Sequence, residues 1–228
     1  MLDGIKTIQD MDLAELKRLV RGGENQTVEF KRKINHPEKV VREVVAFANT
    51  EGGHLLVGVD DNGQIPGLKF PDEEEFVLNK AIGELCRPQI TYVLERIELK
   101  DARSVLHYHI QPSASKPHFA FLKKGHRFGK AFVRVDDRSV QASKEVRKIL
   151  KHQDKEGHAG FEYGEHEKVL MNFLGDHKHI TLPQFCEASG LSHEKASDVV
   201  IKLALNHVIR IVPRELEDWY VFAEEQPE

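Results

Sequence analysis

Residues 23–67 read GENQTVEFKRKINHPEKVVREVVAFANTEGGHLLVGVDDNGQIPG, and this stretch decides how the first part of the chain folds. Pro37 suits a helix start and four valines follow at helical spacing, so we expect a helix over 37–49. Alternation over 27–31 predicts a strand. The nearly continuous apolar run 55–59 predicts a strand that is covered on both faces. A turn at 61–63 then leads to a second short strand around Ile65.

Similar patterns extend over the first two thirds of the chain. We expect a helix over 12–21, ended by Gly22 and Gly23, and a second helix over 71–86 with an acidic first turn. The other expected elements are strands at 90–99, 105–110, 117–121 and 131–135 and a helix at 143–150 capped by Ser143. The segment 152–160 has the composition of a linker. The sequence therefore predicts an α+β layer domain over residues 1–157.

The last seventy residues have a different rhythm. Helical patterns at 165–174, 183–188 and 193–206 precede two short apolar runs at 208–212 and 219–222, which we expect to form a hairpin. This order of helices, turn and hairpin is that of a winged helix-turn-helix. We therefore predict a small winged-helix domain over residues 158–228.

Composition restricts the class of protein. Hydrophobic residues make up 40% of the chain and charged residues 31%, which is typical of a soluble protein, and no apolar run reaches the length of a membrane span. The N-terminus lacks a secretory signal, and two distant cysteines form no disulfide framework, so we expect a cytoplasmic protein. Residues 1–157 carry a net charge of +3 and the remainder −7, which together give −4. Two such regions are expected to meet different partners.

Several segments are candidates for binding anions. Asn49, Thr50, Gly52 and Gly53 are expected to present backbone N–H groups to a phosphate, although glycine also commonly ends a helix. Residues 116–134 interleave cations with phenylalanines, a pattern that suits nucleic acid. Alternation sends most of these phenylalanines inward, so we favour the loop tip, which consists of Lys123, Lys124, His126 and Arg127. His107 and His109 share a predicted strand face, but exposed strand histidines seldom bind metal.

Three motifs carry a resemblance to a known family. EFK at 29–31, AFANTEGGHLLVGVDDNGQIPG at 46–67 and FVRVDDRSVQAS at 132–143 resemble the AlbA-like domain of the Schlafen family and its prokaryotic relatives. The resemblance covers roughly residues 10–150, and the second motif is its most specific part. It implies an α/β lobe that binds nucleic acid, and a winged helix is a common companion in bacterial members.

The resemblance also implies a site. Schlafen members with ribonuclease activity cut structured RNA with three acidic residues, which fall on Glu24, Glu29 and Asp61. Such carboxylates suit Mg²⁺ or Mn²⁺, and Lys31, on the same strand face as Glu29, is expected to contact the scissile phosphate. The expected nucleic-acid contacts are Lys31, Arg32, Lys123, Lys124, Arg127 and Arg134. The structural alternative is that Glu24 caps a turn, Glu29 pairs with Lys31 and Asp61 only forms a turn.

The expected partners follow from the same comparison. Two lobes clamp an RNA duplex in eukaryotic members, so this single lobe is expected to act as a homodimer. We expect no zinc site, because Cys86 is the only cysteine of the first domain. Two alternatives to a ribonuclease stay open. One is a non-catalytic DNA-binding transcriptional regulator that uses its winged helix, and the other is an interaction module that binds a nucleotide.

Overall fold

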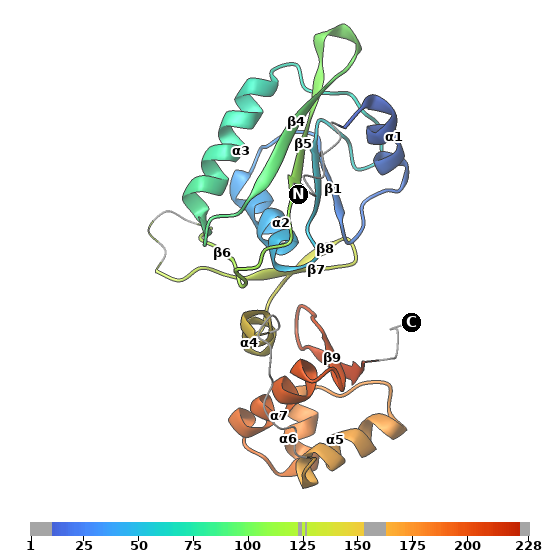
Figure 1. Ribbon diagram of the computed structural model, residues 1–228, viewed down its shortest axis with the longest axis vertical. Helices are drawn as coiled ribbons and strands as arrows, with labels where there is room; N and C mark the ends of the chain where they lie inside the picture. The colour runs from blue at the N-terminus through green and yellow to red at the C-terminus, as the bar shows by residue number, and fades with distance from the viewer. Residues whose placement is uncertain (1–10, 123–124, 126, 153–162, 224–228) are drawn as a thin grey trace, which may run out of the picture.

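The structure is a computed structural model that describes residues 11–122, 125, 127–152 and 163–223. A four-stranded sheet with helices on both faces forms one part of the molecule, and a smaller group of three helices and a hairpin forms the other (Figure 1). The expected mixed α+β class is confirmed. None of the described helices is both long enough and apolar enough to cross a membrane.

The sheet has the strand order β1-β2-β5-β4. The strands β1 and β2 are parallel and are joined by α2, whereas β5 is antiparallel to both β2 and β4. The bounds are β1 Val28–Lys31, α2 Pro37–Asn49, β2 Gly53–Val57, β4 Tyr92–Glu98 and β5 Ser104–Ile110. In β2, Leu55, Leu56 and Val57 are fully buried, as the continuous apolar run predicted.

Helices cover both faces of this sheet. One core lies between the sheet, α2 and α3 (Pro71–Leu85), and a second lies between the sheet and α1 (Leu13–Arg21). Alternation in β1 sends Val28 and Phe30 toward α1, so Glu29 and Lys31 point to the opposite face. The Asp12 carboxylate caps α1 by accepting from the N–H groups of residues 14 and 15.

Two small ladders close the end of this layer. One pairs β3 (Cys86–Arg87) with β6 (Phe119–Ala120), and the other pairs β7 (Phe132–Val135) with β8 (Arg138–Gln141). The predicted strand around Ile65 is wrong, because residues 60–64 form a closed turn and no strand follows it. A 3-10 turn, η1 (Lys100–Ala102), connects β4 to β5.

The remaining elements follow the predicted order. Ser143 caps α4 as expected, since its Oγ accepts from Val146 N–H at 3.1 Å. The bounds are α4 Lys144–His152, α5 Glu165–Asp176, α6 Leu182–Ser189, α7 His193–Leu205, β9 Ile209–Val212 and β10 Trp219–Phe222. The elements α5 to β10, named here the C-terminal group, share a separate core. The predicted linker and the 157/158 boundary fall almost wholly on residues 153–162, outside the described residues.

Candidate functional site

The acidic cluster of the motif region is built around β1. Glu24 lies just before this strand, and its Oε1 accepts from the backbone N–H of Phe30 at 2.8 Å. Glu29 lies within the strand with only 6% of its surface exposed. Burial raises the pKa of Glu24, and the negative charges of Glu29 and Asp61 raise it further. Glu24 is therefore within electrostatic range of both of the other predicted acids.

Two cations occupy the carboxylate of Glu29. Lys31 Nζ contacts one oxygen, and Arg134 Nη1 lies 3.0 Å from the other. Arg134 was predicted to contact nucleic acid, but its side chain is fully buried and its Nη2 donates to Asn25 O at 2.7 Å. Its guanidinium also lies 4.8 Å from the centroid of the Phe47 ring. Arg134 is thus a buried structural cation, and this part of the nucleic-acid prediction is corrected.

A fourth carboxylate, Glu43 of α2, was missed by sequence reasoning. Its Oε2 lies 2.9 Å from Arg134 Nη1 and also accepts from the hydroxyl of Ser139. Burial raises the pKa of Glu43, and the neighbouring charge of Glu29 raises it further. The available signal was the charged pair at 42–43 within an otherwise apolar helix stripe. Such a charge inside a buried stripe indicates a partner from another element.

The cluster does not fit a divalent metal ion as it lies. Both oxygens of Glu29 contact cations, and one oxygen of Glu24 is held by a backbone N–H. Within the described ranges, no three His, Cys, Asp or Glu side chains are arranged to hold a metal. Lys31 and Arg134 already supply the compensating positive charge. The expected Mg²⁺ or Mn²⁺ role of Glu24, Glu29 and Asp61 therefore stays a prediction that this arrangement does not support.

The glycine turn after α2 uses its polar groups internally. Asn49 is buried, and its side chain bonds to the backbone of His118 and of Phe132. The N–H groups of Thr50 and Gly52 both donate to Phe47 O, at 3.1 and 3.0 Å. They are therefore not directed at a phosphate. Gly53 packs against the Phe47 ring so closely that a Cβ would lie 2.4 Å from it.

The predicted basic contacts lie in different surroundings. Arg32 is largely exposed, with its Nε 3.4 Å from Asp60 Oδ1. Lys123 and Lys124 lie outside the described residues. Arg127 is exposed, and its guanidinium carbon lies 5.5 Å from the centroid of the Phe128 ring. Phe128 is itself 77% exposed. Arg127, a residue of the predicted loop tip, thus forms a cation and aromatic pair on the surface with Phe128.

A row of histidines lies on the α1 side of the sheet. His54 of β2 is directly opposite His109 of β5, and their rings stack at 4.6 Å. His107 Nε2 lies 2.8 Å from His54 Nδ1, and His107 Nδ1 lies 2.7 Å from Glu95 Oε2. Burial lowers the pKa of His54 to about 4, and nearby histidines lower it further. Burial also lowers the pKa of His107, so His54 and His107 are neutral hydrogen-bonding groups at neutral pH.

Cysteine chemistry has no support in the first part of the chain. Cys86 is fully buried, and burial raises the pKa of its thiol to about 12. A thiol with such a pKa is a poor nucleophile and a poor metal ligand. Cys86 is therefore a core residue.

Comparisons with known proteins agree with the sequence motifs. Residues 24–143, more than half of the chain, match the family profile described as Schlafen, AlbA_2. The N-terminal domain of a RecG-related protein from Nitrosomonas europaea is 20% identical over 66% of this chain and 96% of its own, with a TM-score of 0.40. The DIP2311 protein from Corynebacterium diphtheriae is 18% identical over 78% of this chain but only 32% of its own, with a TM-score of 0.42. Both structures are too distant to assign a family. The profile match covers more than half of the chain, and this chain therefore belongs to the Schlafen AlbA_2 family.

Proposed function

We propose that this protein binds nucleic acid and that the segment leading into β7 contacts it. Membership of the Schlafen AlbA_2 family suggests such a role. The observation that carries the proposal is the surface pair formed by Arg127 and the 77% exposed Phe128. An exposed ring offers a stacking surface to a base, and the adjacent guanidinium attracts the phosphate backbone. Gly129 packs against Phe121 and against Phe119 of β6, so the segment that carries Arg127 and Phe128 is held next to β6.

A matched pair on α3 makes the test specific. Phe76 is 67% exposed with Lys80 Nζ 6.0 Å from its ring centroid, but it follows the acidic first turn of α3. Binding of labelled 20-nucleotide RNA and DNA is measured by fluorescence anisotropy. We expect R127A/F128A to weaken binding about 5- to 100-fold, the range for loss of one stacked base. F76A/K80A should bind like the wild-type protein. An equal loss in both variants would contradict the proposal.

Cleavage of RNA by Glu24, Glu29, Asp61 and Lys31 is a separate proposal. It is supported by the electrostatic effect of Glu29 and Asp61 on Glu24, whereas the cations on Glu29 argue against a metal held there. The wild-type protein and D61N are incubated with tRNA, with and without Mn²⁺. Asp61 is exposed, so its replacement should leave the fold intact. Equal cutting by both proteins would remove Asp61 from the catalytic set.

The C-terminal group supports a second candidate, a DNA-binding regulator. Its order of three helices and a hairpin is that of a winged helix. Its recognition-type helix α7, however, exposes Glu194 and Asp198 beside Lys195, which weakens attraction to phosphate. If this group reads DNA, K195E should reduce affinity for duplex DNA at least as much as R127A/F128A.

We also propose that the protein is a homodimer. Light scattering on a sizing column tests this by giving the mass of the particle in solution.

A further inference from the structure

Helix α4 joins the sheet layer to the C-terminal group and has two chemically distinct faces. Its cations are Lys144, Arg147, Lys148 and Lys151, which recur at the i, i+3, i+4 and i+7 positions of one helix face. Lys144, Arg147 and Lys151 are exposed, and Lys148 is half-buried. We name these four residues the α4 stripe. The single acid of the helix, Glu145, is buried on the opposite face.

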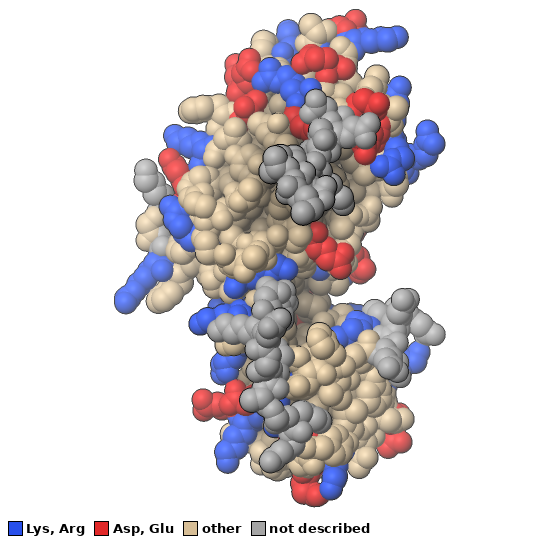
Figure 2. Space-filling view, viewed as in Figure 1, with Lys and Arg blue, Asp and Glu red and all other residues tan. Residues whose placement is uncertain are grey.

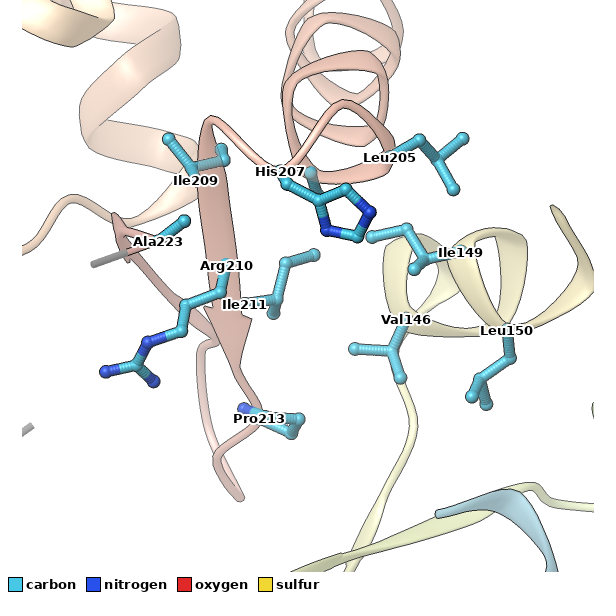
Figure 3. Close-up of a pocket in the computed structure, with 11 residues that line it drawn as sticks. Val146, Ile149, Leu150, Leu205, His207, Ile209, Arg210, Ile211, Pro213 and Ala223 are labelled. Atoms are coloured by element: carbon cyan, nitrogen blue, oxygen red, sulfur yellow. The ribbon is translucent and has the colours of Figure 1, made fainter. Parts of the chain in front are cut away.

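The inner face of α4 is apolar and already packed. Val146 and Leu150 belong to a buried cluster shared with the sheet layer, and Ile211 of β9 packs against it. Together with Ile149 they line a cavity of about 380 Å³ between α4 and β9, in which His207 lies close to the helix (Figure 3). Because this apolar face is turned toward the sheet layer and β9, α4 is not an amphipathic helix free to enter a lipid surface. Its charged face is the one that points away from these contacts.

Few acids compensate the α4 stripe. Lys148 Nζ lies 3.1 Å from Asp198 Oδ1, across to α7. The other three cations have no acidic partner among the described residues. Figure 2 shows Lys and Arg side chains along the left edge of the molecule, beside the place that α4 occupies in Figure 1. The stripe is therefore a cationic surface at the junction of the two parts.

We propose that the α4 stripe is a second contact surface for the phosphate backbone of a nucleic acid. This inference rests on the proposed function and extends it to the junction with the C-terminal group. Neighbouring cations on the stripe are about 5–6 Å apart at their Cβ atoms, a spacing at which several can face one phosphodiester strand. Contacts of this kind neutralise phosphates and release counterions without reading base sequence. The surface is expected to accept RNA and DNA alike.

The chain offers a closely matched control for the test. R147E/K151E reverses two cations one turn apart on α4. K17E/R21E does the same on the exposed face of α1, which lies at the upper right of the molecule, away from α4 (Figure 1). Both double variants lower the net charge by the same amount, so any general charge effect is equal. Circular dichroism and thermal melting confirm that each full-length variant is folded. R147Q/K151Q provides a milder change at the stripe.

Binding of single-stranded and duplex RNA and DNA is measured by anisotropy at several salt concentrations. We expect R147E/K151E to bind about tenfold more weakly or worse, and the slope of log K against log[salt] to fall by about 1.4–1.8. R147Q/K151Q should show a smaller loss of the same kind, and K17E/R21E less than a twofold loss. If the wild-type protein binds no nucleic acid, the proposed function itself fails. Equal losses in the α4 and α1 variants, or no loss in either, overturn the stripe while leaving that function standing.

Discussion

Arg134 Nη1 lies 3.0 Å from Oε2 of Glu29, a residue 105 positions earlier in the chain, and 2.9 Å from Oε2 of Glu43. One buried guanidinium thus joins β1, α2 and β7. The two carboxylates repel each other, and the repulsion is tolerated because Arg134 and Lys31 lie between or beside them. The motifs at 29–31 and 132–143 therefore supply Glu29, Lys31 and Arg134 to a structural ion network.

Replacement of Arg134 should be severe. In R134M the buried Glu29 and the half-buried Glu43 both lose the guanidinium that they share, and breaking a buried pair in this way costs about 3–5 kcal/mol of the free energy of unfolding. Urea denaturation followed by circular dichroism measures the loss. Arg138, four residues later in the same hairpin, is exposed, so R138M should change stability by less than about 0.5 kcal/mol. Similar losses in both variants would show that the network is not the cause.

Local signals predicted most of the fold. The helix over 37–49 was found at its observed bounds because Pro37 opens it and the valine stripe gives it one buried face. β8 was missed because its hairpin turns through Asp136, at a φ of +56°, where the sequence lacks the usual Asn-Gly or Asp-Gly signal. The strand around Ile65 was wrong because Asp60 N–H donates to Gln64 O and Gly63 N–H donates to Asp60 O, which closes the turn on itself.

The candidate site was less predictable. The family motif grouped Glu24 with Glu29 and Asp61, and both of these acids act on the pKa of Glu24. Nothing local indicated that Arg134 would turn inward. In a strand, alternation alone gives two faces and does not say which face a neighbouring helix covers. Glu43 lies 91 positions and Glu29 105 positions before Arg134. Contacts over such separations depend on tertiary packing, so these pairs could be recognised only in the structure.

Acid should destabilise the protein through His54. Its folded pKa of about 4 lies below the ordinary value of 6.5, so the unfolded chain takes up the proton first. Stability is therefore retained above pH 6.5 and lost as the pH falls from 6.5 toward 4. One proton contributes at most about 1.4 kcal/mol per pH unit, and less here because the ring is partly exposed. Urea denaturation of H54Q across this range should show a shallower pH dependence than the wild-type protein. An unchanged slope would contradict the assignment.

Gly52 should tolerate no side chain. Its φ is +81°, and a Cβ there would lie 2.6 Å from Ile110 O and 2.8 Å from Pro112 Cδ. We expect G52A to lower the free energy of unfolding by more than about 1 kcal/mol. Gly83 lies within α3 with open space around its Cβ direction, so G83A should stabilise the protein by about 0.5–1 kcal/mol. Thermal melting of the two variants gives opposite shifts if this account is correct.

The junction between the two parts depends on a buried polar contact. Ser197 Oγ of α7 donates to Glu145 Oε1 of α4 at 2.5 Å, and both residues are buried. S197A leaves that carboxylate oxygen without its donor, which should cost about 1–3 kcal/mol. Fluorescence of Trp219, the only tryptophan, reports unfolding of the C-terminal group. In an E145Q background the same serine replacement should cost less, because no buried charge is left unpaired. A cost independent of residue 145 would mean that S197A acts through packing rather than through this hydrogen bond.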